Sequence, residues 1–355
     1  MSALREGFTT GSCAAACALA SCLWRRDGVC PLHVALVTPD GRTFAPEIKP
    51  KGTYVCAAKK DAGDDPDVTN GCEVWARAEV MDEEGPVRFR AGEGVGIITR
   101  PGLKLPVGEA AINPMPREMI QRAVRSVFPT QAVMVTVGVT GGRALAQRTF
   151  NPRLGVEGGL SILGTTGVVR PMSEDALTET IRLELSMRRA GGADEVALVF
   201  GSQGEAALRR LCPELSAVQI SNFVGAALDA AAELGFVRVL LAGQPGKLVK
   251  VAGGSMQTHS RYGDGRRETL IAHLARMCAP ISLLESVWAS TTLDGMIAQI
   301  EEAGYARVWE RLCREASAYG MARVRGALPV DTMMLDAKGQ VLGAYRVPDE
   351  EEECP

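Results

Sequence analysis

The sequence predicts a two-domain protein, an α+β domain followed by a small parallel α/β domain. The 355 residues exceed one typical domain, and 46% hydrophobic with 23% charged residues is ordinary for a folded globular chain. In the second half, short apolar runs alternate with helical segments, which is typical of a parallel sheet, whereas the first half lacks this alternation. We expect domains at 1–165 and 166–345, followed by an acidic tail at 346–355.

Helices and strands are mixed in the first half. Residues 12–26 are rich in Ala and follow Thr9, Thr10 and Gly11, which predicts a helix with a hydroxyl cap. An amphipathic helix is expected over 115–128, behind a Pro-Met-Pro segment. Alternating apolar residues predict strands at 32–38 and 73–80, and two further strands, 132–139 and 144–150, are expected around the turn Thr140-Gly141-Gly142.

A Gly-rich passage at 155–171 separates the two halves. Beyond it, apolar runs bounded by turn residues predict strands at 195–200, 217–220 and 237–242. Helical periodicity predicts helices at 173–189, from Glu205 onward, and at 222–234, 267–278, 291–303 and 306–320.

Composition excludes several classes of function. The net charge of -3 gives no global positive field for nucleic acid or an anionic membrane, and 5% aromatic residues argue against base-stacking platforms. The chain contains no apolar run long enough to span a membrane, and the amino terminus does not resemble a signal peptide. The ten Cys include no CxxC pair, so we expect reduced thiols in a cytoplasmic protein.

The segment after the 195–200 strand is a candidate ligand site. Gly201-Ser202-Gln203-Gly204 lies between a predicted strand and a predicted helix, which would present free backbone N–H groups at a helix N-terminus. Ligands of open α/β sheets bind at this edge of the sheet. A simple tight turn explains the same residues equally well.

A second candidate is the acidic run that contains Asp61, Asp64, Asp65 and Asp67. Carboxylates so close together suit Mg²⁺ or Ca²⁺, although the spacing is not that of an EF-hand. Asp also favours exposed turns, because its side chain bonds its own backbone. A third interpretation is that these carboxylates and Thr69 bind a polar ligand.

Other polar loops offer weaker signals. Arg100 and Lys104 follow a Gly-rich stretch and would suit an anionic ligand, though a hairpin explains the glycines as well. Small hydroxyl residues adjoin Gly in two segments, 9–11 and 164–167, which either wrap a ligand or form turns. His259 lies in a Gly-flanked polar loop and is a candidate for acid–base chemistry.

Seven segments of the chain, taken in order, match the pattern of one family. They are REGFTTGSCAAA (5–16), KDAGDDPDVTNG (60–71), GEGVGIITRPGLKLPVGEAAINPMPR (92–117), EGGLSILGTTGVVRPMS (157–173), ISNFVGAALDAA (220–231), GKLVKVAGG (246–254) and THSR (258–261). These segments resemble the cobalt-precorrin-5B C1-methyltransferases of cobalamin biosynthesis. They cover nearly the whole chain, and seven ordered matches are far more specific than any one.

The chain departs from the family pattern in two places. The family's loop resembles Pro-Gly-Asn-Tyr-Gly-Glu where this chain has GSQGE at 201–205. The family tends to carry His-Ile-Gly-Lys where this chain has Gln244-Pro245-Gly246-Lys247. The second departure removes a His, so no catalytic role is assigned to position 244.

The resemblance implies methyl transfer from S-adenosylmethionine to carbon 1 of a cobalt-containing corrinoid, with transient hand-off between enzymes of the pathway. It also implies a permuted ribosomal-S5-domain-2-like fold for the first domain. Cobalt belongs to the substrate, so no protein-bound metal is expected. The sulfonium methyl is already activated, and alignment of the reactants with exclusion of water is the main task.

Residue roles follow from the resemblance and from side-chain chemistry. Catalytic candidates are His259, Asp64 and Asp65. Candidates for the S-adenosylmethionine site are Gly201, Gly204 and Asp229, with Asp61 and Thr69 as the alternative. Groups expected to hold the substrate are Thr9, Thr10, Arg100, Lys104, Thr165, Thr166, Lys247, Lys250 and Arg261.

Two other classes of function remain open. A non-catalytic corrinoid carrier would bind the pigment without S-adenosylmethionine. A metal-dependent phosphotransferase would use the acidic run for Mg²⁺, but the chain has no phosphate-binding loop with Lys and Ser/Thr at the required spacing.

Overall fold

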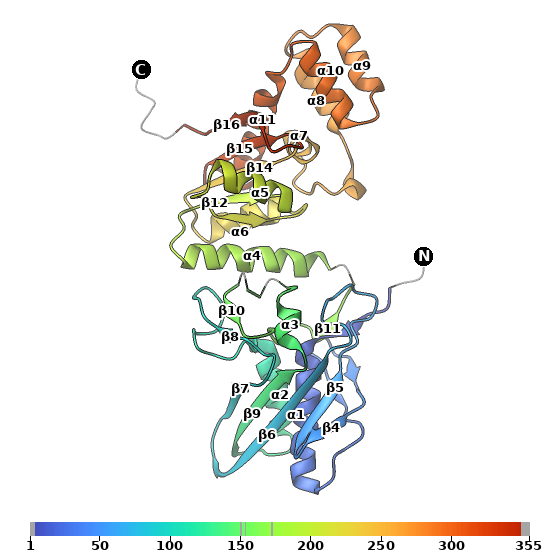
Figure 1. Ribbon diagram of the computed structural model, residues 1–355, viewed down its shortest axis with the longest axis vertical. Helices are drawn as coiled ribbons and strands as arrows, with labels where there is room; N and C mark the ends of the chain where they lie inside the picture. Colours follow the sequence, from blue (N-terminus) through green and yellow to red (C-terminus); the bar gives the residue numbers. More distant parts are fainter. Residues whose placement is uncertain (1–3, 150, 153, 172, 349–355) are drawn as a thin grey trace. The chain divides into compact units, whose positions relative to one another are not determined.

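The computed structural model describes residues 4–149, 151–152, 154–171 and 173–348 (Figure 1). The chain forms two compact units, Met1–Glu174 and Asp175–Pro355. Residues 166–171, expected at the start of the second domain, belong to unit 1. Most of the predicted acidic tail, residues 349–355, lies outside the described residues.

Unit 1 is built on a five-stranded sheet. Neighbouring strands are antiparallel except β7 and β9, which run parallel. Alternate residues of β6 and β9, such as Val74, Ala76, Val135 and Val137, are fully buried, as the alternating sequence predicts. The strand order is β4 (Lys49–Gly52), β5 (Val55–Lys59), β6 (Glu73–Glu84), β9 (Gln131–Val139) and β7 (Val87–Ala91).

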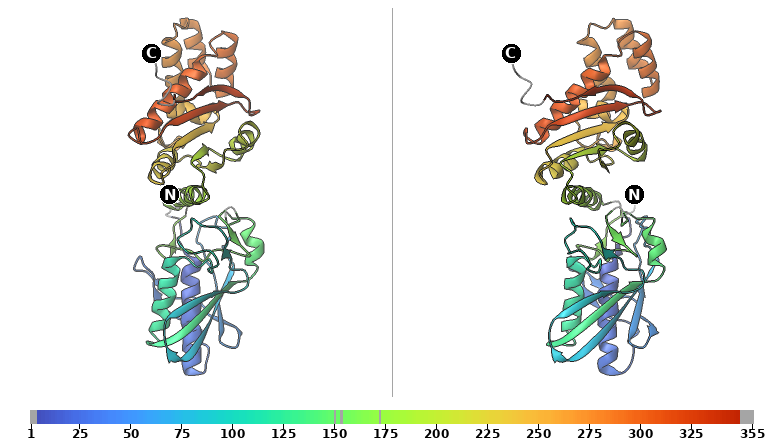
Figure 2. Two further views of the ribbon diagram at one scale, coloured as in Figure 1. Left: turned by 90° about the vertical axis from the view of Figure 1, so that its left-hand side faces the viewer. Right: turned by 60° about the vertical axis from the view of Figure 1, so that its left-hand side comes forward.

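Helices α1 (Thr10–Asp27) and α2 (Pro114–Arg125) pack on this sheet (Figure 2). α1 is buried along its Ala- and Cys-rich stretch, so small side chains allow the helix to approach β5 and β6 closely. Thr9 caps its start, and Gly28, with φ of 77°, ends it in the left-handed conformation that favours glycine. Both helices expected in this half of the sequence are confirmed.

Three short strand pairs lie beside this core. They are β1 (Gly7–Phe8) with β11 (Val168–Val169), β8 (Ile97–Ile98) with β10 (Val156–Glu157), and β2 (Leu36–Val37) with β3 (Thr43–Phe44). The strand expected at 32–38 is therefore much shorter than predicted.

The strand expected at 144–150 is wrong. Residues Gly142–Ala146 form the short helix α3, and turns follow as far as residue 149; residue 150 lies outside the described residues. Gly141, with φ of 69°, turns the chain, and the Ala and Leu that follow are strong helix formers.

Unit 2 contains a five-stranded sheet whose first four strands are parallel, which confirms the parallel order expected here. β16 is an additional antiparallel edge strand that the sequence did not predict. The strand order is β13 (Ala217–Gln219), β12 (Glu195–Val199), β14 (Arg238–Gly243), β15 (Val330–Leu335) and β16 (Val341–Tyr345). The chain moves outward from β12 in opposite directions, so β12 and β14 flank the topological switch point.

Helices cover both faces of this sheet. On one face, Leu208 of α5 (Ser202–Leu211) packs with Ala197 and Val199 of β12. On the other face, Val196 and Leu198 belong to the main core of the unit. That core includes residues from α4 (Glu174–Ala190), α6 (Val224–Glu233), α7 (Pro245–Ala252) and α11 (Val308–Arg323).

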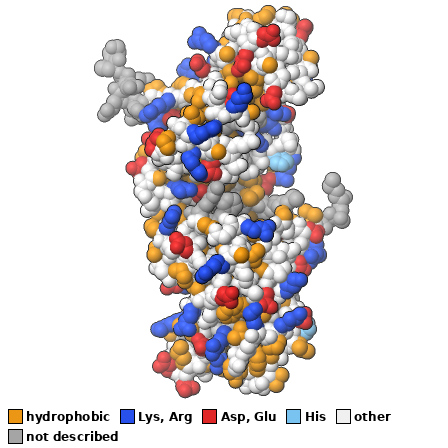
Figure 3. All heavy atoms as spheres, in the orientation of Figure 1, with side chains coloured by type: hydrophobic (Ala, Val, Ile, Leu, Met, Phe, Trp, Pro, Cys, Tyr) orange, Lys and Arg blue, Asp and Glu red, His pale blue; other side chains and the backbone are white. Residues whose placement is uncertain are grey.

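Three further helices follow α7 along the chain (Figure 2). They are α8 (Arg266–Ala275), α9 (Ile281–Ala289) and α10 (Leu293–Glu302). The sequence predicted α8, α10 and α11 but neither α7 nor α9. Among the described residues, no helix combines the length and apolar character needed to cross a membrane. On the face of each unit seen in Figure 3, basic and acidic side chains are interspersed.

Candidate functional site

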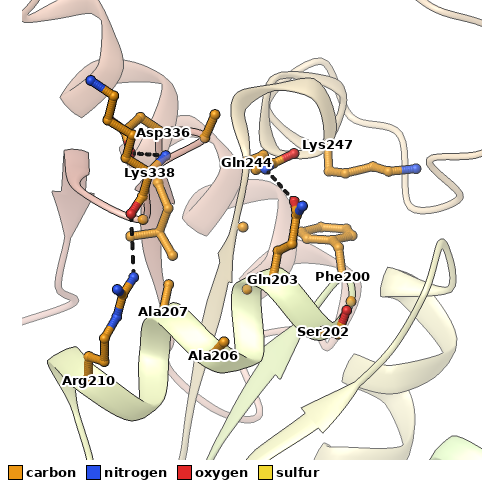
Figure 4. Close-up of a pocket in the computed structure, with 16 residues that line it drawn as sticks. Phe200, Ser202, Gln203, Ala206, Ala207, Arg210, Gln244, Lys247, Asp336 and Lys338 are labelled. Atoms are coloured by element: carbon orange, nitrogen blue, oxygen red, sulfur yellow. Dashed lines mark hydrogen bonds between the residues drawn. The ribbon is translucent and has the colours of Figure 1, made fainter.

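A cavity of about 440 Å³ opens at the carboxyl ends of three parallel strands of unit 2 (Figure 4). Its lining includes residues at or shortly after the end of each strand: 200–204 for β12, 243, 244 and 247 for β14, and 336–339 for β15. We call this cavity the strand-end pocket. It lies at the topological switch point between β12 and β14, where open α/β sheets bind their ligands.

Two helices begin at the strand-end pocket. Gly201 precedes α5 and Gln244 precedes α7, and neither helix start has a hydrogen bond from a capping side chain. Pro245 occupies the first turn of α7, where its missing N–H is tolerated. Helix N-termini carry partial positive charge and unpaired N–H groups, so this pocket favours a ligand with a carboxylate or another anionic group.

The amides of Gln203 and Gln244 meet across the strand-end pocket. Nε2 of Gln244 donates to Oε1 of Gln203 at 3.0 Å, as the dashed line in Figure 4 marks. Both residues lie in the segments where the chain departs from the family pattern described above. The Phe200 ring lies close beside Gly243, where a Cβ would come within 2.3 Å of a ring carbon. The two departing segments are therefore neighbours in space, joined by a hydrogen bond.

Lys247 lines the same pocket and is partly buried. Its ammonium donates to Oδ1 of Asn222 at 2.5 Å. Burial lowers the pKa of Lys247, and the positive charges of Lys250 and Arg266 lower it further. An anionic ligand group would relieve this charge crowding.

Lys250, by contrast, points into its own unit. It is only 6% exposed, and its ammonium donates to the backbone oxygens of Thr258 at 3.3 Å and Gly263 at 3.0 Å. It therefore holds the loop that carries His259 and Arg261. In that loop, Nδ1 of His259 accepts the backbone N–H of Arg261 at 3.1 Å, and His259 is exposed.

Asp229 lies on α6 and forms a two-pronged ion pair with Arg323 of α11, at 3.0 and 2.6 Å. It is not among the described residues that line the strand-end pocket. The structure thus gives Asp229 a partner that joins two helices. Of the residues predicted for S-adenosylmethionine, Gly201 and Gly204 line the pocket.

In unit 1, the two Thr-Gly segments contact each other. The hydroxyl of Thr10 donates to the backbone oxygen of Leu163 at 3.3 Å and accepts its N–H at 3.1 Å. The hydroxyl of Ser12 donates to the oxygen of Gly167 at 2.6 Å, and Thr9 caps α1. Thr165 and Thr166 are exposed on the same loop.

Arg5 forms hydrogen bonds with the first carboxylates of the acidic run. The Arg5 guanidinium donates to both oxygens of Asp61, at 2.5 and 2.9 Å, and the Arg5 backbone N–H donates to Asp64 at 2.6 Å. The hydrogen bond from Arg5 is the largest influence that lowers the pKa of Asp61. The backbone N–H of Asp65 donates to Ala62 at 3.4 Å.

The last carboxylate of the acidic run, Asp67, forms an ion pair with the buried Lys60. The Lys60 ammonium, with a side chain only 2% exposed, lies 2.5 Å from Oδ2 of Asp67. Thr69 donates to Oδ1 of Asp67 twice, from its backbone and its hydroxyl, each at 2.7 Å. Burial raises the pKa of Asp67, but Lys60 and Thr69 together outweigh it, and the pKa lies below its usual value. Within the described ranges, no group of three or more His, Cys, Asp or Glu is placed to hold a metal ion.

Arg100 and Lys104 are exposed on the loop after β8. The alkyl chain of Arg100 packs against Gly155, whose φ of 61° and lack of a Cβ allow that contact. The predicted residues therefore fall into separate sets. In unit 1, segments 61–64 and 163–167 both contact segment 5–12. In unit 2, the sets are the strand-end pocket and the 258–263 loop.

Sequence reasoning missed Asp336, Phe200 and Arg210, which also line the strand-end pocket. A signal for Asp336 was present: the run VDTMML is rich in strand-forming residues, and the turn-forming DAKG follows it. The strand register that brings this turn beside β14 is not encoded locally.

A pocket between helix starts at the ends of parallel strands is typical of proteins that bind a small polar molecule. The chain belongs to the CbiD family. The family model described as CbiD matches residues 1–171, and the model described as CbiD, C-terminal domain, matches residues 257–346.

Similar proteins with curated names cover nearly the whole chain. The chain is 40% identical to the cobalt-precorrin-5B C(1)-methyltransferase of Desulfitobacterium hafniense strain Y51, over 95% of this chain and 89% of that protein. It is also 40% identical to the protein of the same name from Salmonella typhimurium strain LT2, over 98% and 94%. A crystal structure of the cobalamin biosynthesis protein (cbiD) from Archaeoglobus fulgidus is 26% identical, covering 78% of this chain and 85% of that one, with a TM-score of 0.39.

Proposed function

We propose that this chain is a cobalt-precorrin-5B C1-methyltransferase of the corrin-ring stage of cobalamin biosynthesis. The observation that carries the proposal is the 40% identity to proteins of that name over 98% of the chain, which includes both units. The substrate is then a cobalt-containing corrinoid, and the cobalt enters with it. Transient hand-off to other enzymes of the pathway and a cytoplasmic location stay predictions.

The methyl donor in this proposal is S-adenosylmethionine, bound in the strand-end pocket. A volume of about 440 Å³ suits a small molecule, since such sites span about 300–1,000 Å³. The starts of α5 and α7 suit the donor's carboxylate, and the absence of side chains at Gly201 and Gly204 lets a ligand approach the backbone.

The reaction forms a bond from carbon 1 to the methyl group as the sulfur–methyl bond breaks, and the neutral thioether leaves. Because the sulfonium is already activated, alignment of the two reactants and exclusion of water supply the catalysis. His259 is proposed to act on a proton of the ring. Its Nδ1 accepts the backbone N–H of Arg261, so Nε2 is the ring nitrogen left to contact the substrate.

Cationic side chains are proposed to bind the carboxylates on the corrinoid rim. In unit 2, Lys247 and Arg261 are candidates for direct contact, and Lys250 supports the loop of Arg261 through its bonds to backbone oxygens. In unit 1, the remaining candidates are Arg100, Lys104, Thr9, Thr10, Thr165 and Thr166, with Asp61, Asp64, Asp65 and Thr69 for polar groups of either ligand.

The finer fold assignment also belongs to this proposal. A permuted ribosomal-S5-domain-2-like topology for unit 1 is supported by the packing of α1 and α2 on a mixed five-stranded sheet.

The test combines purified protein, S-adenosylmethionine and freshly prepared cobalt-precorrin-5B, followed by mass spectrometry of the pigment. We expect the pigment to gain one methyl group, and only when all three components are present. A pigment that binds tightly but gains no methyl group would instead support the carrier function and contradict the proposal.

A further inference from the structure

Asp336 is the one carboxylate among the described residues that line the strand-end pocket. It lies directly after β15, in the turn 336–339 that connects β15 to β16. The charged residues that share this lining, Arg210, Lys247 and Lys338, are all cations. Asp336 is therefore the position at which the pocket offers a charged hydrogen-bond acceptor.

The carboxylate of Asp336 is held in place by its own turn. Oδ1 accepts the backbone N–H groups of Lys338 at 2.8 Å and Gln340 at 2.7 Å. Oδ2 has no hydrogen-bond partner among the described residues. One oxygen thus fixes the orientation of the group, and the other remains available to a ligand.

The turn itself packs against α5. A Cβ at Gly339 would lie 2.9 Å from the Cβ of Ala207, so the turn and the helix are in close contact. The Arg210 guanidinium donates to the backbone oxygen of Lys338 at 3.4 Å, as Figure 4 shows. Because α5 also lines the pocket, the Asp336 carboxylate is preorganised relative to the helix start that suits an anion.

This inference rests on the proposed function, in which the pocket holds S-adenosylmethionine. That molecule offers one anionic group, two cationic groups and a pair of ribose hydroxyls. Asp336 cannot take the carboxylate, because like charges repel. A carboxylate beside the sulfonium would stabilise a charge that disappears during methyl transfer, and would raise the barrier. The ammonium is bonded to the same carbon as the carboxylate, so it lies with that carboxylate at the starts of α5 and α7. The ribose hydroxyls are neutral donors that suit the open oxygen.

We propose that Asp336 accepts hydrogen bonds from the ribose hydroxyls of the methyl donor and so selects a ligand with an intact ribose. The nucleoside end of the ligand then lies at the β15–β16 turn, and its amino-acid end lies toward the starts of α5 and α7.

The test measures dissociation constants by calorimetry for two ligands, S-adenosylmethionine and 5′-methylthioadenosine, which lacks the amino-acid portion. The variant is Asp336→Asn, whose amide oxygen still accepts the turn N–H groups while its NH₂ replaces the open acceptor. We expect both ligands to bind more weakly by about ten- to a hundred-fold, the range for a lost hydrogen bond to a charged group. Asp82→Asn, the same charge change on an exposed position of β6, is the matched control and should bind like the parent protein.

A third ligand separates ribose recognition from a general effect on folding. For 5′-methylthio-2′,3′-dideoxyadenosine, which lacks both hydroxyls, Asp336→Asn should cause no further loss, because the partner of the carboxylate is already absent. Weakening of S-adenosylmethionine alone would assign Asp336 to the amino-acid end and overturn the inference, as would equal binding by parent and variant. A parent protein that binds none of the ligands would overturn the proposed methyl-donor site as well.

Discussion

Because Lys60 is more deeply buried than its partner Asp67, we expect Asp67→Asn to lower the free energy of unfolding more than Lys60→Met does. The Lys60 side chain is 2% exposed and the Asp67 side chain 28%. Asp67→Asn leaves an ammonium buried without a countercharge, which costs about 3–5 kcal/mol of the free energy of unfolding. Lys60→Met leaves a carboxylate that still reaches water and keeps both donors of Thr69, so we expect a loss of about 1–3 kcal/mol.

Urea denaturation of the two single variants and the double variant measures these losses. Hydrogen exchange of β5 and β6, followed by mass spectrometry, reports unit 1 separately from unit 2. We expect the double variant to be more stable than Asp67→Asn alone, because it removes the unpaired ammonium. If Asp67→Asn unfolds no more readily than Lys60→Met, the reasoning from unequal burial is refuted.

The ion pair of Lys60 and Asp67 also makes the free energy of unfolding depend on pH. The pKa of Asp67 is lowered in the folded state, so its ionised form stabilises the fold above the unfolded pKa of about 3.9, and that stability is lost as the pH falls through the lower folded pKa. The free energy of unfolding should therefore decrease in acid more for the parent protein than for Asp67→Asn. Parallel acid profiles for the two proteins would contradict this linkage.

Three further outcomes are expected. Gly243→Ala displaces the Phe200 ring, which lines the strand-end pocket, and should weaken S-adenosylmethionine binding about tenfold by calorimetry. Unchanged affinity would argue against that site. In thiol titration of the native protein, exposed Cys278 should react well before Cys13, whose pKa burial raises to about 12; simultaneous reaction would contradict the burial. Lys250→Met should speed hydrogen exchange in the 258–263 loop; unaltered exchange would contradict its supporting role.

Local sequence signals predicted the elements whose pattern is strong over many residues. Helix α1 is rich in Ala behind a hydroxyl cap, and the strands β9, β12 and β14 are apolar runs bounded by turn residues; all four lie where expected. The segment 144–150 was expected to be a strand because it follows the turn at 140–142, but Ala and Leu after a left-handed Gly141 favour a helix. β15 and β16 were missed, since β15 depends on its pairing with β14 and β16 on its pairing with β15.

The residues of the candidate site also divide into those that local sequence predicts and those that depend on tertiary packing. Gly201 and Gly204 were predicted because a strand, a Gly-containing loop and a helix follow one another directly in the sequence. Asp336 reaches the same pocket from a strand that begins almost a hundred residues after β14 begins, and no local pattern predicts that register. The ion pair of Asp229 with Arg323 is equally distant in sequence, and it depends on how α6 packs against α11.

The hydrogen bonds from hydroxyl groups of α1 to the 163–167 segment can form only late in the synthesis of unit 1. Thr10 leaves the ribosome 153 residues before Leu163, its partner. At about 5–20 residues per second, the start of the first helix waits roughly 8–30 s for that partner. β1 waits equally for β11, with which it pairs. The first segment of unit 1 to be synthesised is thus among the last to complete its hydrogen bonds. A nascent chain that stalls before residue 168 lacks the β11 strand with which β1 pairs.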